Sequence, residues 1–156
     1  MIIRRANKSD VEGVNTLLNQ VLYVHHVGRP DIFKAVGKKY TDEELFVIFE
    51  DDTTPVFVAV DDSEKILAHC FCVVTEHKDH SSLTDIKTLY IDDLCVHEDA
   101  RGTGVGKQMY AYTLDYAKQI GCYNVTLNVW AENKSALEFY KAMGLTTQKI
   151  GMEKIL

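Results

Sequence analysis

The spacing of hydrophobic and polar residues divides the chain into strands and amphipathic helices. Runs rich in branched and aromatic residues predict strands at 2–4, 55–60, 66–75, 88–96, 123–130 and 147–155. Apolar residues that recur every three or four positions predict helices at 11–24 and 104–120, and shorter ones at 31–37, 42–50 and 133–143. Two Ser/Thr-x-x-Glu capping boxes mark helix starts, one at Ser9 and one at Thr41.

The order of these elements indicates the fold class. The main elements follow the order β-α-α-β-β-β-α-β-α-β, which fits an α/β fold with a mixed, mostly antiparallel central sheet and helices on both faces. Two prolines and nine glycines leave few breakpoints, and no repeat, linker or low-complexity tract interrupts the pattern. We therefore expect residues 1–156 to form a single domain.

Composition and charge narrow the range of partners. Hydrophobic residues make up 46% and charged residues 26% of the 156 positions, ordinary values for a chain that builds its core without disulfides or metal. The 17 basic and 23 acidic residues give a net charge of −6. This charge argues against nucleic-acid binding, which needs a basic surface, and suits a cationic partner better.

The sequence also predicts the compartment. No run approaches the roughly 18 apolar residues of a membrane span, and the N-terminus soon turns polar, unlike a secretory signal. None of the four cysteines forms a Cys-x-x-Cys pair, and Cys70, Cys72 and Cys95 lie in strand-like runs. We expect buried, reduced thiols in a cytoplasmic protein without a membrane partner. No metal is expected, because His77 and His80 lack a third ligand at suitable spacing.

The most informative stretch runs from Leu94 to Lys107, where a glycine-rich turn joins a predicted strand to a helix. Such a turn directs unpaired backbone N–H groups and the positive end of the helix at one point, where an anion binds. Two phosphate loops are excluded by their spacing. A Walker A loop would need glycine in place of Arg101 and a hydroxyl residue in place of Gln108. A dinucleotide fingerprint starting at Gly102 would need its third glycine at Lys107.

The pattern that remains is Arg-x-x-Gly-x-Gly, formed by Arg101, Gly104 and Gly106. With this loop, the strand before it and the helix after it, the sequence resembles the GCN5-related N-acetyltransferase (GNAT) superfamily. The run from 133 to 145 is similar to the family's N-x-x-A-x-x-F-Y-x-x-x-G-F block, with a leucine as its last residue. Asp92-Asp93 and Tyr140 look most like the spermidine/spermine N-acetyltransferase branch, with Asp92 in place of a longer glutamate.

The resemblance implies acetyl-CoA as cosubstrate and a primary amine as acceptor. It also implies that the amine attacks the thioester directly, in a ternary complex. The amine must lose a proton first, because with a pKa near 10.4 only about one molecule in 2,500 is neutral at pH 7. Asp92 and Asp93 are neighbours on a strand and are expected to point to opposite faces, so that only one, by resemblance Asp92, meets the amine. A carboxylate of pKa about 3.9 is a weak base, which predicts a bridging water or a raised pKa. For both aspartates the alternative remains open that they are solvated charges at the end of the strand.

The same resemblance assigns the remaining roles. Tyr140 is the candidate acid that protonates the departing CoA thiolate. The backbone of Leu94, Cys95 and Val96 would bind the pantetheine arm and the oxyanion, while the Cys95 thiol is expected to be structural. The residues expected to contact CoA are Arg101, Gly102, Thr103, Gly104, Val105, Gly106, Lys107, Asn133 and Ser135. Asn133 is equally a plain helix N-cap.

The acceptor is left open by the sequence. A polyamine or another small amine is expected, and His25-His26 lie where the family often shapes the acceptor site. A protein N-terminal or lysine acetyltransferase differs only in its acceptor, and a non-catalytic acetyl-CoA-binding or sensor module with the same fold is a further alternative. The family resemblance also leads us to expect a homodimer, with the C-terminal strand as a plausible interface.

Overall fold

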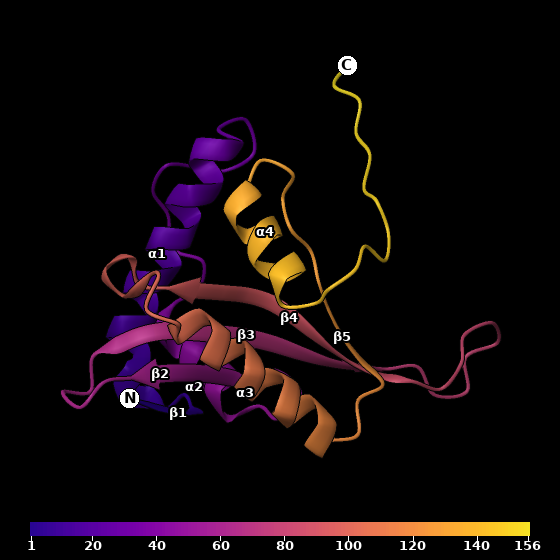
Figure 1. The fold of residues 1–156 in the computed structure, drawn as a ribbon, viewed down its shortest axis with the longest axis horizontal. Coiled ribbons are helices and arrows are strands. Elements are labelled where there is room, and N and C mark those ends of the chain that lie inside the picture. Colours follow the sequence, from indigo (N-terminus) through magenta and orange to yellow (C-terminus); the bar gives the residue numbers. More distant parts are fainter.

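The computed structural model describes all residues from 1 to 156, and its centre is a five-stranded sheet. The strands are β1 (Ile2–Arg5), β2 (Val56–Val60), β3 (Ile66–Glu76), β4 (Lys87–Val96) and β5 (Asn124–Leu127). They lie side by side in chain order and are antiparallel except for the parallel pair β4–β5 (Figure 1). The predicted mixed, mostly antiparallel sheet is confirmed.

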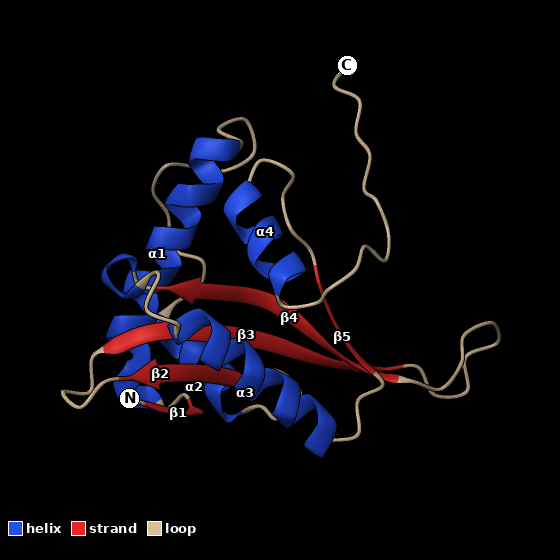
Figure 2. Ribbon diagram, in the orientation of Figure 1, coloured by secondary structure: helices blue, strands red, loops and turns tan.

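Helices cover both faces of this sheet, as predicted (Figure 2). On one face lie α1 (Val11–Gly28) and α2 (Asp42–Glu50), and on the other lie α3 (Val105–Gln119) and α4 (Lys134–Ala142). Two short 3-10 turns, η1 (Lys8–Asp10) and η2 (Glu98–Ala100), precede α1 and α3. No helix is both long and apolar enough to cross a membrane.

Strand β2 shows how the sequence builds a core on each face. Val56, Val58 and Val60 belong to the core beneath α1 and α2. Phe57 and Ala59 belong to the core beneath α3, because successive side chains of a strand point to opposite faces. All five residues are buried, which explains why this strand reads as a continuous apolar run.

The capping box at the start of α2 is confirmed. Thr41 Oγ1 accepts a hydrogen bond from the backbone N–H of Glu44 at 3.1 Å, and the Glu44 carboxylate accepts one from the N–H of Thr41 at 2.7 Å. Each side chain thereby satisfies a donor that the first helical turn leaves free. Helix α1 is longer than expected, since it continues beyond Val24 to Gly28.

The box predicted at Ser9 is wrong. Asn7 and Asp10 form it instead, with the Asp10 carboxylate accepting from the N–H of Asn7 at 2.8 Å. Asp10 is buried and also accepts two hydrogen bonds from the Arg4 guanidinium, at 2.7 and 2.9 Å. This ion pair joins β1 to the start of α1, and the Asn7–Asp10 box caps the 3-10 turn η1 that precedes the helix.

The helix predicted at 31–37 is absent, and this segment forms turns and bends. Asp31, the first residue of the predicted helix, accepts hydrogen bonds from the Arg29 guanidinium at 2.9 and 2.7 Å. Nδ1 of His26 lies 2.8 Å from the carbonyl oxygen of Phe33. One contact with α1 and a local ion pair therefore hold this segment, in place of the hydrogen bonds of a helix.

The strand predicted at 147–155 is also absent, because no element follows α4. Figure 1 shows this C-terminal segment leaving the body of the molecule as an extended chain, and its backbone makes no hydrogen bonds with other backbone groups. A strand requires such a partner. Ile150, Met152 and Ile155 are exposed, and the Glu153 carboxylate contacts the Arg29 guanidinium.

Strands β4 and β5 separate halfway along β4, and this opening positions the site. Their pairing runs from Thr88–Asn124 to Ile91–Leu127, where β5 ends, whereas β4 continues to Val96. The predicted strand at 123–130 is therefore shorter in the structure. From Asp92 onwards, the edge of β4 that faces β5 has no strand partner, and its backbone groups can pair with an extended ligand.

Candidate active site

A β-bulge in β4 lies where β4 and β5 separate. Phe71 of β3 pairs with Asp93, but the next residue, Cys72, pairs with Ile91, so Asp92 is an extra residue without a partner. One extra residue reverses the alternation of side chains along the rest of the strand. Ile91 accordingly belongs to the core beneath α3, whereas Asp93 faces the α1 side of the sheet.

This bulge overturns the expectation that Asp92 and Asp93 point to opposite faces and cannot reach one atom. Nζ of Lys39 lies 2.8 Å from Oδ2 of Asp92 and 3.9 Å from Oδ2 of Asp93. The side chain of Asp92 is 34% exposed and that of Asp93 only 7%. The two carboxylates therefore form one site that holds a single primary ammonium, and Asp93 is not a solvated strand-end charge.

Three groups that can carry positive charge surround the buried Asp93. Nε2 of His69, a fully buried residue of β3, lies 3.5 Å from Asp93 Oδ1. Burial raises the pKa of Asp93, but His69, Lys39 and His25 together outweigh it and hold the pKa below its usual value. Asp93 is thus ionised at neutral pH.

The neighbouring cations respond to burial and charge in different ways. Burial lowers the pKa of His25, and the nearby Asp93 offsets this only in part. Burial also opposes the charge of Lys39, but its hydrogen bond to Asp92 and the charge of Asp93 raise its pKa overall. Lys39 is therefore an ammonium at neutral pH, and two carboxylates face it.

Lys39 and His69 are the site residues that the sequence pattern missed. His69 had a signal, because an ionisable residue interrupts the apolar run of β3. Lys39 had no such sequence signal, since it lies in an irregular segment far from Asp92 in sequence. Only the tertiary fold brings Lys39 close to Asp92.

The loop between β4 and α3 has the turn geometry expected of an anion-binding loop. Gly104 precedes α3 with φ at 91°, a left-handed conformation that favours glycine. A Cβ at Gly106 would lie 3.2 Å from Val96 Cγ2 and 3.6 Å from the Phe139 ring, so β4, α3 and α4 meet closely there. No side chain caps α3, which leaves its first N–H groups available.

A cavity of about 520 Å³ lies beside this loop, between α1 and the start of α4. Arg101, Asn133 and Ser135 line it, so the fold brings together candidates from two distant segments. Arg101 Nε donates to the carbonyl oxygen of Val96 at 3.2 Å. Asn133 also caps α4, as its Oδ1 accepts from the N–H of Ala136 at 3.2 Å.

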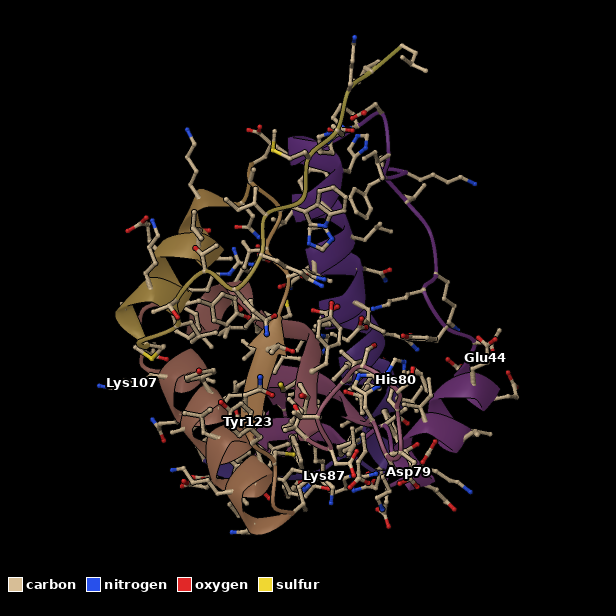
Figure 3. The ribbon with its side chains drawn as sticks, turned by 90° about the vertical axis from the view of Figure 1, so that its right-hand side faces the viewer. Glu44, Asp79, His80, Lys87, Lys107 and Tyr123 are labelled. Atoms are coloured by element: carbon tan, nitrogen blue, oxygen red, sulfur yellow. The ribbon has the colours of Figure 1, made fainter.

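Other candidates from the loop lie outside this cavity. The exposed Lys107 is not among its lining residues, and Figure 3 shows its side chain pointing outwards from the start of α3. Thr103 braces the turn, with its hydroxyl donating to the carbonyl oxygen of Ala100 at 2.7 Å. Leu94 and Val96 pack against the core beneath α3.

Tyr140 lies in the last turn of α4. Its ring packs against Phe139 and Tyr110, with centroid distances of 5.1 and 6.3 Å. Burial raises the pKa of Tyr140, and the negative charge of Asp93 adds to this effect. The phenol thus keeps its proton at neutral pH, as a general acid must.

The cysteines have the environment of structural thiols. Cys70, Cys72 and Cys95 are buried, as predicted, and no disulfide forms. Burial raises the pKa of Cys95 to about 12. Because the thiolate is the reactive form, a thiol with this pKa is a poor nucleophile at neutral pH.

Both the sequence and the fold match known acetyltransferases. The profile of the acetyltransferase (GNAT) family matches residues 24–145. Glucosamine 6-phosphate N-acetyltransferase of Arabidopsis thaliana is 27% identical over 120 residues, which cover 75% of this chain and 68% of that protein. An uncharacterized N-acetyltransferase of Methanocaldococcus jannaschii is 31% identical over 119 residues, which cover 76% of this chain but only 45% of that longer protein. The crystal structure of a mutant protein from Bacillus halodurans superposes with a TM-score of 0.95 at 33% identity, covering 100% of this chain and 99% of that one.

The family match extends from the end of α1 to the residue after Gly144 and so includes the bulge, the glycine-rich loop and α4. It confirms the resemblance at the level of the superfamily. The chain belongs to the acetyltransferase (GNAT) family and is an acetyl-CoA-dependent N-acetyltransferase.

Proposed function

We propose that this enzyme transfers the acetyl group of acetyl-CoA to a small cationic primary amine by direct attack in a ternary complex. The contact of the Lys39 ammonium with Asp92 and Asp93 carries this proposal. A primary ammonium of the protein itself occupies the acidic site beside the opening between β4 and β5. An acceptor with the same group, such as a polyamine, fits the same charge and hydrogen-bonding pattern.

The donor would bind along the free edge of β4. Its pantetheine arm would pair with the backbone from Leu94 to Val96 as an added strand. Its pyrophosphate would meet the free N–H groups at the start of α3 and the Arg101 guanidinium. Asn133 and Ser135, which line the adjacent cavity, would contact the rest of the arm.

The two carboxylates would act differently on the acceptor. Asp93 has a lowered pKa and would hold the ammonium by charge without taking its proton. Asp92 is partly exposed and would pass the proton to water. The neutral amine then attacks the thioester carbonyl, backbone N–H groups of β4 stabilise the oxyanion, and the departing thiolate takes a proton from Tyr140.

A protein lysine is the second candidate acceptor. The same contact favours it, because Lys39 is itself a lysine side chain within a polypeptide. The two candidates differ in the size of the acceptor and not in the chemistry at the nitrogen, so a comparison of small amines with peptides separates them.

Steady-state release of CoA thiol tests the proposal with polyamines, amino acids, aminoglycosides and lysine peptides as acceptors. We expect turnover with cationic primary amines, intersecting double-reciprocal lines, and loss of turnover in the Asp92→Asn/Asp93→Asn double variant. Parallel lines or an acetyl group trapped on Cys95 would contradict direct attack. Calorimetric binding of acetyl-CoA with no thiol release for any acceptor would instead indicate a non-catalytic binding module.

A further inference from the structure

The segment that joins α1 to α2, residues 29–41, is fixed by contacts at both of its ends. Near its start, the Phe33 ring packs against His25 of α1 and Trp130 of the β5–α4 connection, at centroid distances of 4.9 and 5.2 Å. The Arg29 guanidinium lies 5.9 Å from the Trp130 ring. This segment therefore spans from α1 to the chain that leaves β5, on the side of the opening that Asp93 faces.

Near its end, an aromatic stack sets the position of Lys39. The Tyr40 ring stacks on Phe71 of β3 at a centroid distance of 5.8 Å and an interplanar angle of 17°. Phe71 is the cross-strand partner of Asp93. Tyr40 thereby anchors the preceding residue next to the carboxylates, with Lys39 Nζ also 5.3 Å from the Tyr40 ring centre.

The charge environment of Lys39 differs from that of the other ion-paired lysines. It alone among them contacts two carboxylates, whereas Lys38 next to it contacts only Asp42, at 2.8 Å. The Lys39 side chain is 41% exposed, so the ammonium is held at the mouth of the site and can exchange with solvent. Lys38 has the same chemistry outside the site and serves as an internal reference.

We propose that Lys39 is itself an acetyl acceptor of this enzyme, modified in cis by acetyl-CoA bound to the same chain. This inference rests on the proposed function, because it uses the same site and the same chemistry. It goes further in naming a side chain of the protein as a substrate.

The reaction follows from the contacts. The Lys39 ammonium gives one proton to Asp92, 2.8 Å away, which passes it to water. The neutral nitrogen attacks the thioester carbonyl and forms the amide C–N bond as the C–S bond breaks, and the CoA thiolate leaves with a proton from Tyr140. The attacking nitrogen releases its second proton to solvent, from which Tyr140 is reprotonated. The products are acetyl-Lys39, free CoA thiol and one proton, so no further reactant is needed.

Acetylation would also change the site. The amide of acetyl-lysine carries no charge, so Asp92 and Asp93 lose the ammonium that they hold in the unmodified chain. An external ammonium then no longer competes with an internal one. The modified enzyme is thus the form with the acidic site open to a cationic acceptor.

The test is a time course with the full-length protein and acetyl-CoA in the absence of any amine. Peptide mass spectrometry measures acetylation at Lys39 and at Lys38 in the same samples, for the wild type and for the Tyr140→Phe and Lys38→Arg variants. We expect Lys39 to be acetylated about tenfold or more faster than Lys38, because positioning and acid catalysis act only in the site. The first-order rate should not depend on protein concentration, should fall in Tyr140→Phe and should be unchanged in Lys38→Arg.

Parallel assays with the amine panel separate this inference from the proposed function. If wild type acetylates an external amine while Lys39 reacts no faster than Lys38, self-acetylation is wrong and the proposed function stands. If Lys39 is acetylated at the same rate in Tyr140→Phe as in the wild type, the modification is non-enzymatic and self-acetylation is wrong. A rate that rises with protein concentration would replace transfer in cis by transfer between molecules. If neither Lys39 nor any amine is acetylated, both proposals fail.

Discussion

Oδ1 of Asp93 lies 3.5 Å from Nε2 of His69, while its other oxygen, Oδ2, lies 3.9 Å from Nζ of Lys39. The buried carboxylate thus stands between a buried imidazole and a half-exposed ammonium. Neither ring nitrogen of His69 has a hydrogen-bond partner, so its electrostatic contact is with Asp93. His69 therefore faces one oxygen of Asp93, while the other oxygen faces Lys39.

Replacing Asp93 by asparagine should weaken acceptor binding. Asp93 faces the ammonium by charge, with Oδ2 3.9 Å from Lys39 Nζ, and close charge pairs are coupled by about 1.5 kcal/mol or more, so we expect KM for a cationic amine to rise about tenfold or more. KM for acetyl-CoA should change little, because the proposed donor site lies along β4 and the glycine-rich loop. Asp62→Asn, in an exposed turn, is the control. An unchanged acceptor KM in Asp93→Asn would remove this carboxylate from the site.

The lowered pKa of Asp93 predicts how stability depends on pH. A carboxyl group whose pKa is lower in the folded than in the unfolded state stabilises the fold above its ordinary pKa, here 3.8, and this contribution is lost as pH falls through the folded value. We expect the difference in unfolding free energy between wild type and Asp93→Asn to shift in favour of the variant as pH falls below 3.8. Denaturant titrations at several pH values measure it. A difference that is constant with pH would contradict the lowered pKa.

Much of the fold could be predicted because its signals are local. The continuous apolar run of β2, the Thr41–Glu44 capping box and the Arg101–Gly106 loop each depend on residues close in sequence. The errors have tertiary causes. Asp10, which pairs with Arg4, closes a capping box with Asn7 in place of the box predicted at Ser9, and the segment at 147–155 has strand-forming residues but no neighbouring strand to pair with.

The candidate site was predictable in part for the same reason. Motifs in the sequence identified Asp92, Asp93 and Tyr140 as candidates. The one-residue bulge against β3, which determines where both carboxylates point, has no sequence signal of its own. Lys39 could not be predicted as a site residue, because the Tyr40–Phe71 stack that positions it joins segments distant in sequence.

The Tyr140→Phe variant tests the proposed role of Tyr140 as the general acid. The raised pKa keeps the phenol protonated, so removing its oxygen should lower kcat by about a hundredfold to ten-thousandfold, the usual range for a positioned acid. The ring still packs against Phe139 and Tyr110, so the melting temperature and the Kd for acetyl-CoA should be retained. Tyr123→Phe, an exposed position, is the matched control. Unchanged kcat in Tyr140→Phe would assign the tyrosine to packing alone.

The Gly104→Ala variant tests the loop. Its φ of 91° is strained for alanine, at a cost of about 1–2 kcal/mol, and relief of that strain would move the N–H groups at the start of α3. We expect weaker acetyl-CoA binding by calorimetry and a smaller change in acceptor KM at saturating donor. Gly151→Ala is the control, because Gly151 has open space around it and no left-handed φ. Equal acetyl-CoA affinity in both variants would exclude this loop from the donor site.

Replacing Lys39 should improve binding of a cationic acceptor, since the acceptor no longer has to displace an ammonium from Asp92 and Asp93. A partly exposed ion pair contributes about 0–1 kcal/mol, so Lys39→Met should lower the acceptor KM by at most about fivefold. Lys39→Gln, which resembles acetyl-lysine in charge and shape, should act in the same direction, whereas Lys38→Met should have no effect. For acceptors with a single positive charge, this decrease in KM should be smaller at high salt, because salt screens the attraction of both ammonium groups to the carboxylates. A higher KM in both Lys39 variants would show instead that Lys39 helps to form the site, and would contradict its role as an internal competitor.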